Sequence, residues 1–118
     1  MEYSHAVSKD VEDPQALLPL PPVTFHILAA LAEGDRHGYA LIQELKLQAG
    51  TLYRSIQRML EQGLLVEVRG RDLDDDERRR YYRITPFGRR VADAETVRLE
   101  GVLALARRRK LASAKPRQ

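Results

Sequence analysis

The chain has 118 residues, of which 43% are hydrophobic, so it can form one small domain with its own core and a tail. It contains no Cys, which excludes disulfides, thiolate metal sites and cysteine nucleophiles. The formal net charge is only +3, but basic residues predominate from residue 46 onward. That distribution suits a surface facing nucleic-acid phosphates, although interleaved charge is also normal on a soluble surface.

The N-terminal region has no helical or strand periodicity. Residues 1–13 are polar and acidic, and we expect residues 1–19 to form a flexible arm. The stretch 14–20 (PQALLPL) is apolar but interrupted by prolines, which suits either an extended segment lying against another subunit or a disordered lead-in. No apolar run approaches the ~20 residues that span a bilayer, and no signal-peptide pattern is present. We therefore expect a soluble, cytoplasmic protein with no membrane partner.

Two helices are predicted next, one beginning at Pro21-Pro22 and ending at Gly34, the other covering Tyr39–Leu45. Proline suits the first helical turn, and glycine suits a helix end. The buried stripe of the first helix comprises Val23, Ile27, Leu28 and Leu31. The residues between the two helices, Gly34–Gly38, are predicted to form a tight turn. Helix, short turn and helix are the parts of a helix-turn-helix motif.

The stretch Gly50–Leu65 contains the helix around which the rest of the chain is organised. At about 100° per residue its apolar side chains fall within one arc, which should face the core. These are Leu52, Ile56, Met59 and Leu60. The opposite arc can hydrogen-bond base edges or phosphates, and it holds Thr51, Tyr53, Arg54, Gln57, Arg58 and Glu61. An ordinary solvated helix has the same pattern, so this helix alone does not decide the function. Gly63 is expected to end it with a positive φ.

Two strands joined by a charged loop follow this helix and predict a β-hairpin wing. Val66 and Val68 alternate with Glu67 and Arg69, and Tyr81–Thr85 is rich in strand-forming residues. The acidic run 72–77 lacks the glycine and the ligand spacing of a calcium loop, so we expect an exposed tip and no metal site. The arginines expected to reach DNA phosphates on either side of it are Arg69, Arg71, Arg78, Arg79 and Arg80.

A last helix is predicted to begin with Thr85 as N-cap and to continue to about Leu111. A helix of about 25 residues (~37 Å) is longer than a small winged-helix core can cover. Its outer half must be exposed or must pack on a partner, which predicts a homodimer. The apolar stripe assigned to dimerisation comprises Val91, Ala94, Leu99, Val102, Leu103 and Ala106. Residues 112–118 are expected to be a solvated tail.

Three motifs in this order resemble the PadR-like family of transcriptional regulators: HGYAL at 37–41, GTLYRSIQRMLEQGLL at 50–65 and RRYYRITPFGRR at 79–90. The lead-in VTFHILAALAEG at 23–34 is also similar to the family's first helix. The resemblance covers residues 20–106. It implies a mainly α fold with a small β-hairpin: a winged helix-turn-helix at 20–85 and a single C-terminal dimerisation helix at 86–111.

The resemblance also implies a sequence-specific regulator, usually a repressor, that binds a pseudo-palindromic operator as a homodimer. It places Tyr39, Thr51, Tyr53, Arg54 and Gln57 near DNA. Many family members respond to small aromatic or drug-like effectors between the subunits. The Trp that stacks such ligands in one branch has no counterpart here, so no effector residue is assigned.

One departure concerns the connection before the recognition helix, which is shorter here than in the family. We therefore expect residues to be absent between Leu45 and Lys46, either because they were deleted or because the printed sequence skips a loop. Such a loss shortens the preceding helix and changes the angle at which the recognition helix meets it.

The alternative function is a winged-helix module that contacts other proteins and binds no specific DNA. Such a module has no need for the combination of Tyr53, Arg54, Gln57 and Arg58 with flanking wing arginines. An enzyme is disfavoured because the chain has no glycine-rich phosphate loop, no Cys and no metal-ligand spacing among its three His residues. We expect no cofactor.

Overall fold

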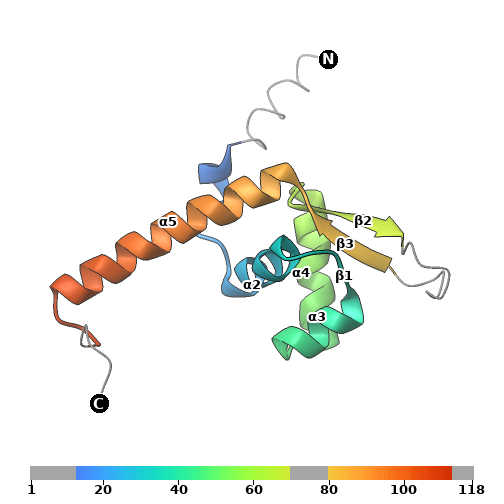
Figure 1. Ribbon diagram of the computed structural model, residues 1–118, viewed down its shortest axis with the longest axis horizontal. Helices are drawn as coiled ribbons and strands as arrows, with labels where there is room; N and C mark the ends of the chain where they lie inside the picture. Colours follow the sequence, from blue (N-terminus) through green and yellow to red (C-terminus); the bar gives the residue numbers. More distant parts are fainter. Residues whose placement is uncertain (1–12, 70–79, 113–118) are drawn as a thin grey trace.

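The computed structural model describes residues 13–69 and 80–112 of the chain. The helical elements are η1 (Pro14–Leu17), α2 (Pro22–Ala32), α3 (Gly38–Leu45), α4 (Ala49–Glu61) and α5 (Pro86–Arg108). The strands are β1 (Arg36–His37), β2 (Leu65–Arg69) and β3 (Arg80–Ile84). In Figure 1, α2, α3 and α4 lie beside the sheet, and α5 runs away from it. The predicted mainly helical winged helix-turn-helix is confirmed.

The core lies where α2, α4 and the beginning of α5 meet the sheet. α2 buries Ile27, Leu28 and Leu31, as its apolar stripe predicts, while Val23 is only partly buried. α4 buries its predicted arc, with Leu60 at the margin, and this arc comprises Leu52, Ile56, Met59 and Leu60. One arc of α4 is thus held in the core, which leaves the opposite arc facing solvent.

The sheet has three antiparallel strands in the order β1-β3-β2, rather than the two strands of the predicted hairpin. β1 falls within the predicted tight turn, and its Arg36 lies opposite Tyr82 of β3. A strand of two residues is too short to show an alternating pattern in the sequence. The Arg83 guanidinium donates hydrogen bonds of 3.1 and 2.8 Å to the Asp35 carboxylate. These bonds help to hold the turn before α3 against the wing.

The corner between β3 and α5 is closed by hydrogen bonds that one threonine donates and accepts. Thr85 is the predicted N-cap: its Oγ1 accepts a hydrogen bond of 2.8 Å from the Gly88 N–H. The same hydroxyl donates to the Gly63 carbonyl at 2.7 Å, and the Thr85 N–H donates to the Leu64 carbonyl at 3.1 Å. Gly63 has the expected positive φ, +77°. The end of α4 is thereby tied to the beginning of α5.

Residues 13–20 pack against the same chain, which contradicts both predicted alternatives for the proline-interrupted stretch. Leu20 is buried, and Leu17 and Leu18 pack against the core. The buried Glu95 of α5 accepts a hydrogen bond from the Leu20 backbone. Arg98 donates two more to Glu95, at 2.7 and 2.8 Å. The prolines prevent a long helix but leave the leucines free to reach the core, so residues 13–19 are not part of a flexible arm.

Acid should weaken this attachment of Leu20 to α5. The hydrogen bonds from Arg98 hold the pKa of the Glu95 carboxyl below its ordinary value of 4.5, despite the opposing effect of burial. A lowered folded-state pKa contributes stability that is complete above the unfolded value and is lost as the pH falls through the folded value. We expect the urea midpoint of the wild type to fall below about pH 5, and that of Glu95→Gln to fall less. Equal acid dependence in the two proteins would contradict this role of Glu95.

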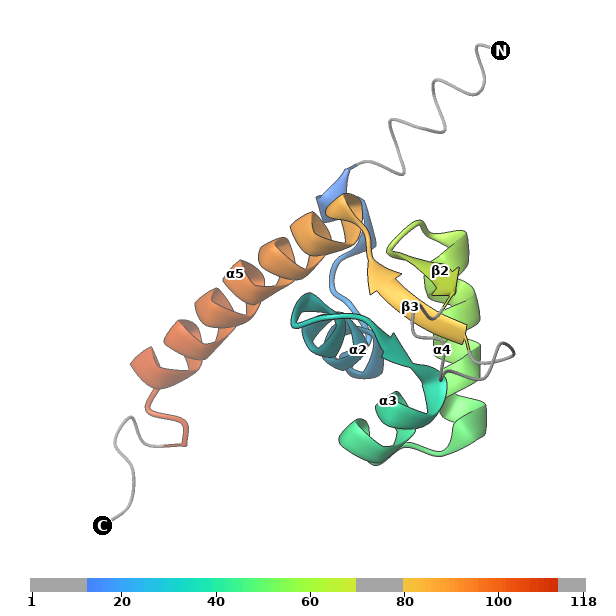
Figure 2. The ribbon, with the colours of Figure 1, turned by 45° about the vertical axis from the view of Figure 1, so that its right-hand side comes forward.

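α5 belongs to the domain in its first half only, and Figure 2 shows its second half leaving the domain. Val91 was assigned to dimerisation, but it is fully buried within this single chain. That assignment is wrong, because the side chain is already used by the domain's own core. The helix ends at Arg108, a few residues before the predicted Leu111.

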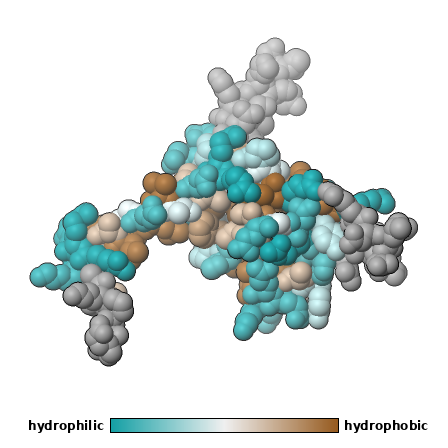
Figure 3. Space-filling view, in the orientation of Figure 1, coloured by the Kyte–Doolittle hydropathy of each residue, from teal (hydrophilic) through white to brown (hydrophobic). Residues whose placement is uncertain are grey.

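We call residues 97–108 the α5 extension. Its apolar stripe is open to solvent: Leu99, Val102 and Leu103 are 38%, 49% and 50% exposed, and Ala106 is partly buried. Figure 3 shows apolar residues along the extension and hydrophilic residues at its tip. None of the helices formed by residues 13–69 and 80–112 is long and apolar enough to cross a membrane.

Candidate nucleic-acid interface

α4 presents to solvent the side chains that were predicted to contact bases and phosphates. Tyr53 is 47% exposed, and Arg54, Gln57 and Arg58 are also exposed, whereas Thr51 is half-buried. We call Tyr53, Arg54, Gln57 and Arg58 the polar face of α4. Its amide and guanidinium groups suit the hydrogen-bonding edges of adenine and guanine in the major groove.

The connection between α3 and α4 is as short as the sequence indicates. Lys46 has left-handed backbone angles (φ +57°, ψ +48°), and its N–H donates to the Ile42 carbonyl. The Leu47 N–H donates to the same carbonyl at 3.1 Å, and α4 begins at Ala49. These bonds close α3 after eight residues and turn the chain directly into α4. The loss of residues between Leu45 and Lys46 stays a prediction.

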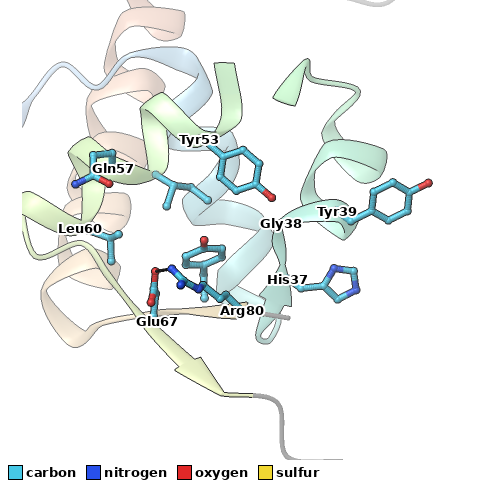
Figure 4. Close-up of a pocket in the computed structure, with 10 residues that line it drawn as sticks. His37, Gly38, Tyr39, Tyr53, Gln57, Leu60, Glu67 and Arg80 are labelled. Atoms are coloured by element: carbon cyan, nitrogen blue, oxygen red, sulfur yellow. Dashed lines mark hydrogen bonds and ion pairs between the residues drawn. The ribbon is translucent and has the colours of Figure 1, made fainter. Parts of the chain in front are cut away.

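A pocket of about 410 Å³ lies between α4, the beginning of α3 and the wing (Figure 4). α4 contributes Tyr53 and Gln57 to its lining, and the wing contributes Glu67 and Arg80. Gly38 lines it from the beginning of α3. The polar face of α4 and the inner face of the wing therefore border one common surface, and a single partner can contact both.

The Tyr53 side chain of α4 lies close to the beginning of α3. Its hydroxyl points toward Gly38 in Figure 4, and a Cβ added at Gly38 would overlap the Tyr53 hydroxyl and ring. A larger residue at this position would force the half-exposed Tyr53 side chain to turn away. The Tyr53 hydroxyl therefore lies close to the beginning of α3, on the side of α4 that lines the pocket.

The strand register places Glu67, Arg80 and Tyr82 on the same face of the wing, toward α4. Glu67 lies opposite Tyr82 in the ladder, and Arg80 precedes Tyr82 by two residues. Arg80 Nη1 is 3.4 Å from Glu67 Oε2. Burial raises the pKa of the Tyr82 hydroxyl above its ordinary value of 10.0, and the charge of Glu67 adds to this effect. The hydroxyl therefore stays protonated at neutral pH and can donate a hydrogen bond.

The remaining predicted contact residues are only partly described. Tyr39 is 64% exposed, and its hydroxyl accepts a 3.1 Å hydrogen bond from Gln43. Arg69 is exposed at the end of β2. Arg71, Arg78 and Arg79 lie outside the described residues, as do the acidic run 72–77, residues 1–12 and the tail from 113.

Sequence reasoning did not identify Glu67 and Tyr82 as part of this surface. The alternation of Val66 with Glu67 favours a strand with its valines inward. In the structure the inner face begins at the buried Leu65, so Glu67 follows on that face and Val66 is exposed. The buried pair Leu64-Leu65 leaves the direction of the alternation ambiguous, and only pairing with β3 decides it. Among residues 13–69 and 80–112, no three acidic or histidine side chains gather closely enough to hold a metal ion.

Solved structures with a similar fold are transcriptional regulators. A PadR family transcription regulator from Clostridium difficile R20291 has a TM-score of 0.69 at 19% identity, over 75% of this chain and 97% of that chain. The transcriptional regulator BldR from Sulfolobus solfataricus has a TM-score of 0.66 at 22% identity, over 86% of this chain and 70% of that chain. At these identities the likeness shows the fold alone.

Sequence comparison identifies the family. The transcriptional regulator Rv3488 of Mycobacterium tuberculosis is 37% identical over 83 residues, which cover 66% of this chain and 76% of that protein. The model of the transcriptional regulator PadR-like family matches residues 27–94, from within α2 to the first half of α5. Since this match covers more than half of the chain and includes α4, the chain belongs to the PadR-like family of transcriptional regulators.

Proposed function

We propose that this protein represses transcription by binding a pseudo-palindromic DNA operator as a homodimer. The observation that carries the proposal is that Tyr53 and Gln57 of the exposed polar face of α4 line one pocket with Arg80 of the wing. Gln57 and Arg54 carry groups that read base edges, and the wing arginines balance phosphate charge. The protein acts by binding DNA in the cytoplasm, not by catalysis.

The α5 extension supports the homodimer. Leu99, Val102 and Ala106 continue the side of the helix on which Val91 and Glu95 are buried, but Leu99 and Val102 are exposed in the described chain and Ala106 is only partly buried. A second copy related by a two-fold axis would cover this stripe and place two α4 helices on one DNA face. Such a dimer binds two half-sites about one helical turn (~34 Å) apart. An effector of this protein would bind between the two α5 extensions.

The proposal is tested by selecting bound sequences from random duplex DNA and then measuring fluorescence anisotropy at several salt concentrations. We expect an inverted repeat, with affinity falling by a logarithmic slope of about 0.9 for each phosphate neutralised. Failure to enrich any sequence would reject specific DNA binding and favour the module that contacts proteins.

Arg54→Ala should weaken binding to the selected operator by about 1–3 kcal/mol, because a guanidinium that binds guanine with two hydrogen bonds carries that much discrimination. Specificity at the corresponding base should relax as well. Arg108→Ala is the control, since it removes the same charge from an exposed position at the end of α5. An equal loss on all duplexes would instead make Arg54 a phosphate contact.

A further inference from the structure

We propose that the pocket between α4 and the wing binds one phosphodiester group of the DNA backbone, and that Glu67 competes with this phosphate for Arg80. The inference rests on the proposed DNA binding and adds to it a site and a residue that limits affinity. The predicted DNA contacts of α4 and of the wing arginines do not by themselves suggest a role for Glu67, because its negative charge is unfavourable next to DNA.

The position of the pocket suits a backbone phosphate. In B-DNA a sugar-phosphate strand separates the major groove from the minor groove. A protein that inserts α4 into the major groove and lays its wing beside it must accommodate that strand between the two elements. The pocket lies there, with Gln57 on the α4 side and Arg80 on the β3 side (Figure 4). Its volume of about 410 Å³ leaves ample room for a phosphate group.

The groups lining the pocket include donors suited to phosphate oxygens. Arg80 supplies a guanidinium, which pairs with phosphate in a fixed planar geometry. Tyr82 supplies a hydroxyl that stays protonated at neutral pH, and Gln57 supplies an amide. Among the described residues of the lining, the acidic group is that of Glu67, on the strand beside Arg80.

The ion pair between Glu67 and Arg80 is weak. The two groups are 3.4 Å apart, which is longer than a strong charge-assisted hydrogen bond, and their side chains are 69% (Arg80) and 41% (Glu67) exposed. Exposed pairs of this kind contribute little to stability, so a phosphate can displace the carboxylate. The displaced carboxylate remains close to the phosphate and repels it. Glu67 therefore lowers affinity for every duplex, and only an operator that also satisfies the α4 side chains compensates for this loss.

The test measures binding of the selected operator and of a scrambled duplex at several salt concentrations. Glu67→Gln should tighten binding to both duplexes by roughly three-fold, the size expected when one exposed ion pair is released. Glu100→Gln, which removes the same charge from an exposed position of α5 away from α4 and the wing, should change affinity less. Arg80→Gln should weaken binding more in the Glu67→Gln background than in the wild type, because Arg80 then has no competing partner. Urea unfolding checks that all variants fold equally well.

Two results would overturn the inference while leaving the proposed function intact. One is an equal gain for Glu67→Gln and Glu100→Gln, which would make the effect a general consequence of charge. The other is strict additivity of Glu67→Gln and Arg80→Gln, which would show that the two side chains act independently on DNA. A wild-type protein that binds no duplex would overturn the proposed function and this inference together.

Discussion

Replacing Gly88 by alanine is expected to destabilise the folded protein by about 2–4 kcal/mol. A Cβ at this position overlaps the backbone carbonyl of Leu64 and crowds the Ile84 side chain. That carbonyl cannot move freely, because it accepts the hydrogen bond from the Thr85 N–H. Relief of the overlap must therefore shift α5 away from the end of α4 and disturb the Thr85 cap. The change is measured as a lower urea midpoint with an unchanged slope.

Gly101 provides a matched control in the same helix. A Cβ added there meets no atom within 4 Å. Because alanine has the higher helix propensity, Gly101→Ala should stabilise the protein by roughly 0.5–1 kcal/mol. The same chemical change thus has opposite signs at two positions of α5. A neutral Gly88→Ala would show that the contact between α5 and the Leu64 carbonyl is not tight.

Val102→Glu is expected to raise the dissociation constant of the proposed homodimer by a factor of about 100 or more, since a carboxylate buried without a partner costs at least ~3 kcal/mol. Val102 is 49% exposed in the single chain, so the substitution should leave the fold of the subunit intact. Operator affinity should fall with the dimer, because the half-sites would then be bound independently. Sedimentation equilibrium gives the first quantity, and anisotropy on the selected operator gives the second.

Val97→Glu is the control for this change. Val97 is 66% exposed and lies about 140° around the helix from Val102, away from the proposed dimer stripe. It should leave both the dimer and operator binding in place. A wild-type protein that remains monomeric at micromolar concentration would reject the dimer, and an unchanged Val102→Glu dimer would place the interface elsewhere.

The helices and their ends follow from short-range patterns. The apolar arc of α4, the proline at the start of α2 and the threonine cap of α5 act within one or two turns, so their positions were predictable from the sequence. The exposure of the polar face of α4 follows from the same periodicity. The exposed stripe on the second half of α5 was also predictable, because the helix is too long for the core.

Three features depended on contacts between residues distant in the sequence. The two-residue β1 exists only because β3 lies beside it, with Arg83 bound to Asp35. The leucines before α2 pack against the core, and the Leu20 backbone hydrogen-bonds to the buried Glu95, although the neighbouring prolines favour an extended segment.

The face of β2 was the third such feature, and it decided the candidate site. The sequence by itself determined which residues α4 would expose, because a helix that packs against the core on one side can bury only one arc of its surface. Only the tertiary structure decided that Glu67, and not Val66, faces that helix, because a strand's direction of alternation is set by pairing and by the anchoring of its first residue. The pocket and the ion pair between Glu67 and Arg80 follow from that strand pairing. The close approach of Tyr53 to Gly38 follows from the position of α4 beside α3.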